Sequence, residues 1–516
     1  MSQFIQKYEE KITGTLSGWD RIVFRGTLRM LCFVDGMMGY LAHVGVLLKD
    51  FGEHAQAMTE RLIAASLAAA EEAARPIEYL QSAQTRKEDL ARDIAQRDGI
   101  QEGLICVLTC VEPCKTYEIH RNREEKLLQL RLRLRKCKFL YHYWIDPQFG
   151  FMSARIQTWF PFSIQVCMNG REWLAHRMDE AGMDYQRYDN SFPWIDDFSK
   201  AQKLMDRMQA TRWPKVLDGV AKRLNPAYGS MFRGLDMAYY WSAYQTEWAT
   251  DIAFASKGAL AAIYPPLVRG AIATFASHDV MRFLGKRLDR RYSGEVVSDY
   301  GDRPEGVRVK HLAFGNALKV YDKGGSILRV ETTINQPGAF RSYRASQSEP
   351  DGEKSWRPMR KGVADLHRRA EVSQQCNDRY SDALASLDTT TPLGTLAAAV
   401  CRRVTKDGKR YRALRPWSEE DQKLLEVLSD GAFAVQGFCN RDLACRLYPF
   451  AHADPAQRAR TASKVSYRLR ILRAHGLIRK SPSQRRYHVT TKGRDIMTAL
   501  CRSHHITLQQ LNATAA

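Results

Sequence analysis

The chain has 516 residues, 44% of them hydrophobic and 26% charged, which is the composition of a globular protein with several domains. Its 78 Lys and Arg outnumber its 57 Asp and Glu, and the net charge of +21 favours a polyanionic partner, nucleic acid in particular. It has no apolar run long enough to span a bilayer, no apolar core of a signal peptide at its start, and no disulfide framework among its 11 cysteines. We therefore expect a cytoplasmic protein that does not bind membranes.

Residues 1–100 are predicted to form a mainly helical region. Residues 1–50 mix short apolar runs with basic residues and show no clear helical or strand period. From about residue 53 to residue 98 the apolar positions recur at helical spacing, with a break at Pro76.

Residues 101–387 are predicted to form an α+β region with a mostly antiparallel sheet. Strand-like runs lie at 103–111, 126–145, 151–160 and 162–168, and a helical run follows from Arg171. Residues 195–290 are expected to be rich in helices, residues 307–334 to form a β-meander, and residues 361–387 a long helix. Cys106, Cys110 and Cys114 recur every four residues, and on a buried strand we interpret them as core residues rather than a zinc site.

A linker is expected at 388–417, followed by a basic module at 418–516. Residues 401–516 hold 23 Lys and Arg against 9 Asp and Glu, and residues 461–516 hold 11 against 1. Three helical runs precede a basic loop and a final helix, and Val465, Leu469 and Leu472 fall at the spacing of a core face. Such a concentration of charge favours contact with nucleic acid.

The segment LRILRAHGLIRKSPSQRRYHVTTKGRDI resembles the winged-helix DNA-binding domain of MarR-type bacterial regulators. In that family a recognition helix ends in GLI, a basic hairpin wing follows, and Y-x-x-T-x-x-G opens the last helix. The resemblance implies a DNA-binding winged helix (helix-turn-helix class) that needs no cofactor to bind, with RNA as the alternative ligand. By the same resemblance the residues that face DNA would be Arg458, Arg460, Thr461, Ser463, Lys464 and Arg468, with Arg485 and Arg486 on the wing. The alternatives are a winged helix used for protein contacts, or a solvated basic face.

The stretch KVYDKGGSILRVETTI, residues 319–334, reads as a hairpin with one apolar and one charged side. It resembles the terminal hairpin of the rolling-circle replication initiators of plasmids and filamentous phages, in which a glutamate helps to bind a divalent metal. That resemblance implies Glu331 as a ligand of Mg²⁺ or Mn²⁺, and Tyr321 and Lys323 as further catalytic candidates. Further carboxylates would be needed, and Asp299, with Glu295 and Asp302 beside it, is the candidate that lies upstream.

Three interpretations of the charged side remain open. It is a solvated face of cross-strand pairs, a passive groove in which Lys319 and Arg329 contact a nucleic-acid backbone, or a metal-dependent site. The blocks GTLSGWDRIVFRGTLRML and GLICVLTCVEPCKTYEIHRNREEK also resemble an uncharacterised bacterial protein family. The sequence thus predicts a nucleic-acid-binding protein, a transcriptional regulator or a plasmid or mobile-element protein. The alternative is a metal-dependent nicking enzyme of the replication-initiator or transposition type. The oligomeric state is not predicted.

Overall fold

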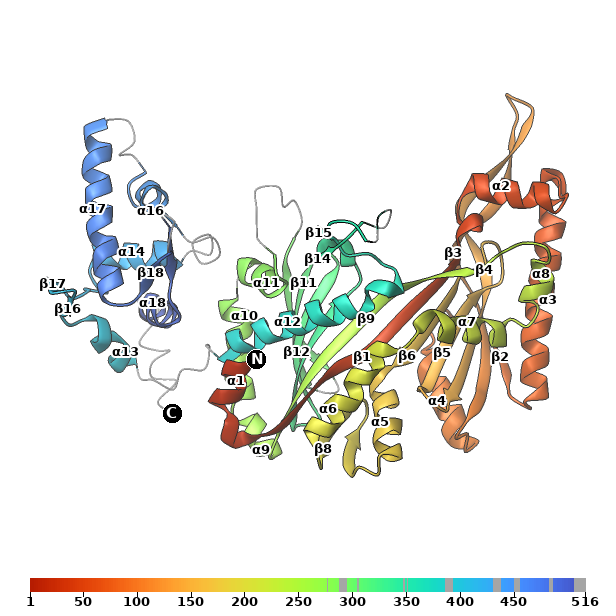
Figure 1. The fold of residues 1–516 in the computed structure, drawn as a ribbon, viewed down its shortest axis with the longest axis horizontal. Coiled ribbons are helices and arrows are strands. Elements are labelled where there is room, and N and C mark those ends of the chain that lie inside the picture. The colour runs from red at the N-terminus through yellow and green to blue at the C-terminus, as the bar shows by residue number, and fades with distance from the viewer. Residues whose placement is uncertain are drawn as a thin grey trace. The chain divides into compact units, whose positions relative to one another are not determined.

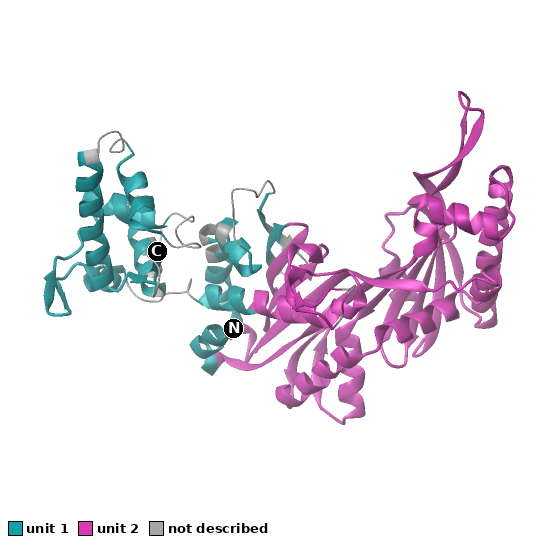
Figure 2. Ribbon diagram, turned by 45° about the horizontal axis from the view of Figure 1, so that its top comes forward, with its two compact units in different colours: residues 1–10, 258–313, 378–516 teal, residues 11–257, 314–377 magenta. Residues whose placement is uncertain are grey.

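The computed structural model describes all residues except 276, 287–294, 304–305, 347–348, 350, 386–392, 430–437, 450–454, 482–485 and 505–516. The chain divides into two compact units (Figure 2). Unit 1 comprises Met1–Glu10, Gly258–Ala313 and Asp378–Ala516, and unit 2 comprises Lys11–Lys257 and Phe314–Asn377. Within the described ranges no helix combines the length and the apolar character that a membrane crossing requires.

Unit 2 is built on one large sheet with the strand order β12-β13-β9-β1-β6-β5-β4-β3-β2. Its neighbouring strands pair antiparallel, except that β2 runs parallel to β3. The mostly antiparallel sheet of an α+β fold is therefore confirmed. The strands are β1 (Ile12–Leu28), β2 (Ile77–Leu80), β3 (Gly103–Asn122), β4 (Leu127–Asp146), β5 (Gly150–Gln157), β6 (Ile164–Asn169), β9 (Tyr239–Phe254), β12 (Asn316–Lys323) and β13 (Ile327–Ile334).

Two central strands lie where the sequence predicted something else. β1, with 17 residues, occupies the region expected to be mainly helical, and β9, with 16 residues, occupies a region expected to be rich in helices. The two strands pair along most of their lengths and run side by side in Figure 1. β1 is buried on both faces at residues 18–20 and 22–24, and β9 at residues 248–254, so these stretches lack the alternation of polar and apolar residues that marks a half-exposed strand.

The main core of unit 2 packs against this sheet, and in it Trp19 and Trp248 meet at a ring-centroid distance of 4.8 Å. Helices and two small hairpins complete unit 2. The helices are α2 (Val34–His43), α3 (Phe51–Glu72), α4 (Lys87–Arg97), α5 (Gly170–Glu180), α6 (Phe198–Arg207), α7 (Trp213–Leu224) and α8 (Tyr228–Met231). The hairpins pair β7 (Tyr185–Tyr188) with β8 (Ser191–Ile195), and β14 (Arg341–Arg344) with β15 (Ser355–Pro358).

Unit 1 contains α1 (Ser2–Lys7), α9 (Lys257–Ala261), α10 (Tyr264–Thr274), α11 (Ser277–Phe283) and the antiparallel pair of β10 (Val297–Arg303) with β11 (Gly306–Ala313). The long helix expected at 361–387 is present as α12 (Leu366–Ala385), which crosses the boundary between the units.

The C-terminal module has a core of its own. Its elements are α13 (Leu393–Val400), β16 (Val404–Lys406), β17 (Lys409–Tyr411), α14 (Glu419–Ser429), α16 (Asn440–Leu447), α17 (Pro455–Ala474), β18 (Ile478–Lys480), β19 (Tyr487–Val489) and α18 (Thr491–Ser503). Val400 and Leu414 belong to this core together with Val465, Leu469 and Leu472. The range 388–417, which was expected to be a linker, is thus in its described part a folded portion of the module.

Candidate metal centre

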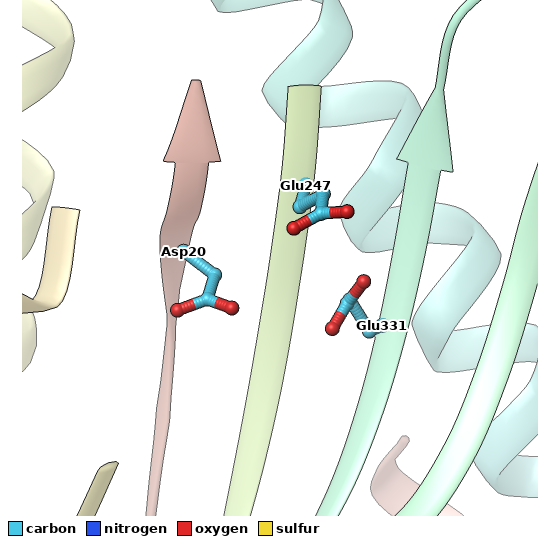
Figure 3. Close-up of side chains that lie close together, drawn as sticks. All are labelled: Asp20, Glu247 and Glu331. Atoms are coloured by element: carbon cyan, nitrogen blue, oxygen red, sulfur yellow. The ribbon is translucent and has the colours of Figure 1, made fainter. Parts of the chain in front are cut away.

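Three carboxylates from three neighbouring strands converge on one face of the sheet in unit 2. They are Asp20 on β1, Glu247 on β9 and Glu331 on β13, and they offer oxygen atoms that all lie within 4.8 Å of one another. Figure 3 shows the three side chains pointing toward one another in front of their strands. Asp20 and Glu331 are only 4% and 2% exposed, so this is not a solvated acidic surface.

Asp20 lies at a β-bulge next to Glu247. Trp19 pairs with Trp248 and Arg21 pairs with Glu247, which leaves Asp20 as an extra residue on β1. The bulge therefore sets both Asp20 and Arg21 opposite Glu247, with the carboxylate of Asp20 on the side where Glu247 lies.

The neighbouring strand β12 surrounds Glu331 with donors. The ammonium of Lys319 lies 2.5 Å from Glu331 Oε1 and 3.6 Å from a carboxylate oxygen of Glu247. The hydroxyl of Tyr321 donates to Glu331 Oε2 at 2.8 Å, and the hydroxyl of Thr333 donates to Oε1 at 3.2 Å. These bonds fix the orientation of Glu331 relative to the other two carboxylates.

A fully buried arginine connects the same three strands through its hydrogen bonds. Arg329 of β13 donates to both oxygens of Asp251 on β9, at 2.6 and 2.9 Å, and to Asp20 at 3.3 Å. It also donates to the backbone carbonyl of Asn190, and Arg171 of α5 lies 3.2 Å from Asp251. Two buried cations thus balance Asp251 and part of the charge of Asp20.

Burial and mutual repulsion shift the pKa values of the three carboxylates in different directions. Burial, and then the charge of Glu331, raise the pKa of Glu247 to about 7, against the opposing effect of Lys319. Burial also raises the pKa of Asp20, although Arg329 opposes it. For Glu331 the raising effect of burial is outweighed by Lys319, Arg329 and the Tyr321 bond, and its pKa is lowered. Near pH 7 Glu247 is therefore partly protonated.

The donor set fits a small divalent cation. Mg²⁺ and Mn²⁺ prefer hard oxygen ligands, and three carboxylates provide them. Asn190 donates its amide nitrogen to Asp20 at 2.6 Å, while its amide oxygen is buried and has no hydrogen-bond partner in the described chain. That oxygen is a further candidate ligand. Asp20, Glu247 and Asn190 also line a cavity of about 380 Å³, which gives Asp20 and Glu247 access from outside.

The structure places the predicted hairpin as expected, since β12 and β13 pair with Lys319 opposite Glu331 and Tyr321 opposite Arg329. It overturns the interpretation of a solvated face, because every residue of β13 is buried. Arg329, expected to contact a nucleic-acid backbone, is 0% exposed. Lys323, expected to contact a phosphate, is buried and lies 2.5 Å from the carboxylate of Asp189. Burial raises the pKa of Tyr321 well above its usual value, so its hydroxyl stays protonated as a donor to Glu331.

The partners of Glu331 are not the upstream acids that the sequence suggested. Asp299 lies on β10 of unit 1, exposed and opposite Lys310, and Glu295 is exposed just before that strand. Neither belongs to the carboxylate group, and the side chain of Asp302 lies outside what the structure describes. Asp20 and Glu247 were missed because they lie far from the hairpin in sequence, on strands without a clear strand pattern.

The basic residues predicted to face DNA lie mostly on α17. Arg458, Arg460, Ser463 and Lys464 are exposed and Thr461 is half-buried. Arg468, which was expected at the surface, is 6% exposed and forms an ion pair with Glu420. Arg486 is half-buried, and Arg485 lies outside the described residues.

The chain matches no family model, no curated protein and no solved structure.

Proposed function

We propose that this chain is a divalent-metal-dependent enzyme that cleaves phosphodiester bonds in nucleic acid. The observation that carries the proposal is the convergence of the buried Asp20 and Glu331 with the half-buried Glu247, whose oxygen atoms lie within 4.8 Å of one another beside an accessible cavity. Buried carboxylates repel one another and lose hydration, so evolution tolerates such a group mainly where a cation or a reaction needs it.

Asp20, Glu247 and Glu331 would hold Mg²⁺ or Mn²⁺, with the amide oxygen of Asn190 as a further ligand. When bound, such an ion polarises a phosphodiester and lowers the pKa of a water molecule. Tyr321 is a positioning residue, because its hydroxyl keeps its proton and orients Glu331. Lys319, which is 14% exposed beside two of the carboxylates, supplies a positive charge close to the place where a phosphate would enter.

Nucleic acid is the proposed substrate because of the charge of the chain and of its C-terminal module. The net charge is +21, and α17 presents Arg458, Arg460 and Lys464 at its exposed surface. We propose that this module binds DNA in the manner of the winged helix that its sequence resembles, and that it recruits the substrate. DNA binding without cleavage is the second candidate function, and this basic helix favours it.

The test is a cleavage assay on supercoiled and single-stranded DNA with the full-length protein. Wild type should cut in Mg²⁺ or Mn²⁺ and not in EDTA, whereas Asp20→Asn, Glu247→Gln and Glu331→Gln should each lose more than about a hundredfold in rate. Asp299→Asn is the matched control, since it removes an exposed carboxylate outside the group and should cut like wild type. Calorimetry should show one class of Mn²⁺ site that Glu331→Gln weakens. If wild type neither takes up Mn²⁺ nor cuts DNA, the enzyme proposal fails and DNA binding alone remains.

A further inference from the structure

Arginine and tyrosine side chains form a row on the sheet beside the carboxylates. Arg29, in the 3-10 helix η2 (Arg29–Cys32) after β1, places its guanidinium 3.5 Å from the ring centre of Tyr240 on β9. Arg25 of β1 lies 5.9 Å from the ring centre of Tyr244. Tyr240 and Tyr244 are 37% and 45% exposed, which is unusual for two large aromatic residues on a central strand.

The pairing of β1 with β9 puts this row on the same face as the metal centre. Arg21 pairs with Glu247, Arg25 with Ser242, and Thr27 with Tyr240, and directly paired residues share a face of the sheet. Tyr244 is the extra residue of a second irregularity, between the pairs Val23–Gln245 and Phe24–Ala243, and its contact with Arg25 places it on that face as well. At about 3.3 Å per residue the row extends roughly 20 Å along β9, from Glu247 to Tyr240.

Arg21 connects the row to the cavity. It is exposed, it lines the cavity together with Asp20 and Glu247, and its Nε donates to the sulfur of Cys167 at 3.1 Å. Three arginines and two exposed tyrosines thus follow one another outward from the carboxylates.

We propose that the substrate is a single strand of nucleic acid and that this row holds it, with bases stacked on Tyr240 and Tyr244 and phosphates at Arg21, Arg25 and Arg29. Aromatic rings on a sheet can stack only on bases that are unpaired, whereas a duplex hides its base faces. Each tyrosine has an arginine at its ring, which provides a charge for the adjoining phosphate. The inference rests on the proposed function, because the row ends at the metal centre to which it would lead the strand.

The experiment measures binding of fluorescent oligo-dT to the full-length protein in EDTA, where cleavage is absent. Tyr240→Ala and Tyr244→Ala should each weaken binding roughly tenfold, Tyr244→Phe should not, and Arg25→Ala should reduce the salt slope by about one counterion. Tyr79→Ala is the matched control, since Tyr79 is 59% exposed on β2 of the same unit, outside the row. It should bind oligo-dT like wild type.

The outcomes separate this inference from the proposed function. If Tyr240→Ala and Tyr244→Ala bind oligo-dT as the wild type does, the proposed row is overturned, even if the wild type cuts DNA. The same holds if the two variants lose as much affinity for duplex DNA as for oligo-dT. If the tyrosine variants lose oligo-dT binding but the wild type does not cut DNA, the row is supported and the proposed cleavage activity is overturned. Glu331→Gln should abolish cleavage and leave oligo-dT binding within about twofold of wild type, because Glu331 lies outside the row. Equal melting temperatures for all variants check that the losses are not due to unfolding.

Discussion

Glu247 is the member of the carboxylate group whose ionisation changes near neutral pH. Its pKa is raised to about 7 by burial and by Glu331, against an ordinary value of 4.5. Between those two pH values the folded protein binds a proton that the unfolded chain has already lost. Stability contributed by this residue is therefore fully present below pH 4.5 and is lost as the pH rises through 7.

The first prediction is that Glu247→Gln stabilises the metal-free protein at pH 8 and changes its stability little at pH 5. The amide keeps the size of the side chain and removes the charge that repels Asp20 and Glu331. We expect a gain of about 2–3 kcal/mol at the higher pH, measured by denaturant unfolding in EDTA. An equal difference at both pH values would show that the effect of Glu247 is not electrostatic.

The second prediction is that protons and the metal compete for Glu247. Because a ligand carboxylate must be deprotonated, Mn²⁺ affinity should rise as the pH increases from about 5.5 to 7.5 and then level off. Each bound ion should release about half a proton from Glu247 at pH 7 and close to one proton at about pH 6. Titration calorimetry in two buffers with different ionisation enthalpies measures that number, and zero released protons would contradict the placement of the ion at Glu247.

At the scale of elements, the metal centre depends on the register of β1, β9 and β13, each of which supplies one carboxylate. Arg329 of β13 links the three strands, because it bonds Asp251 on β9 and Asp20 on β1. The third prediction is that Arg329→Met lowers the free energy of unfolding by about 3–5 kcal/mol at pH 7, because Asp251 and Asp20 lose their buried partner. Arg133→Ala is the control, since Arg133 is 55% exposed, pairs with Glu118 and should cost less than about 1 kcal/mol. If Arg329→Met lowered the free energy of unfolding by only a small amount, the buried carboxylates would be accommodated by protonation and would not need the arginine.

The elements also explain how far the sequence could go. β12 and β13 alternate polar and apolar residues around a Gly-Gly turn, so the hairpin and Glu331 were predicted. Asp20 lies at a bulge, and β1 and β9 contain stretches buried on both faces, so the period that identifies a strand is interrupted in the two strands that supply the other carboxylates. Alternation also made the charged side of β13 look solvated, whereas Asp189 and Asn190 of the β7–β8 turn contact Lys323 and Arg329 there. Which face is covered depends on residues distant in sequence.

At the scale of the whole molecule, two chemistries are assigned to two parts of the chain. The carboxylates and the row of arginine and tyrosine belong to unit 2, and the exposed basic face of α17 belongs to the C-terminal module in unit 1. If binding and cleavage reside in separate parts, they should respond to different substitutions. A module that recruits duplex DNA should set affinity and its salt dependence, while the metal centre sets the rate of the chemical step.

The last prediction tests that division in the full-length protein. Arg460→Ala with Lys464→Ala removes two exposed charges of α17, and the affinity for duplex DNA should fall with a salt slope lower by about two. Cleavage of a saturating single-stranded oligonucleotide should continue at the wild-type rate, since neither residue lies in unit 2. Arg402→Ala with Arg403→Ala removes the same charge from exposed positions outside α17 and should leave more of the duplex affinity intact. Arg468→Ala should instead lower the melting temperature, because Arg468 is buried and paired with Glu420. If the α17 pair loses cleavage of the saturating oligonucleotide as well, the two activities are coupled and the division is wrong.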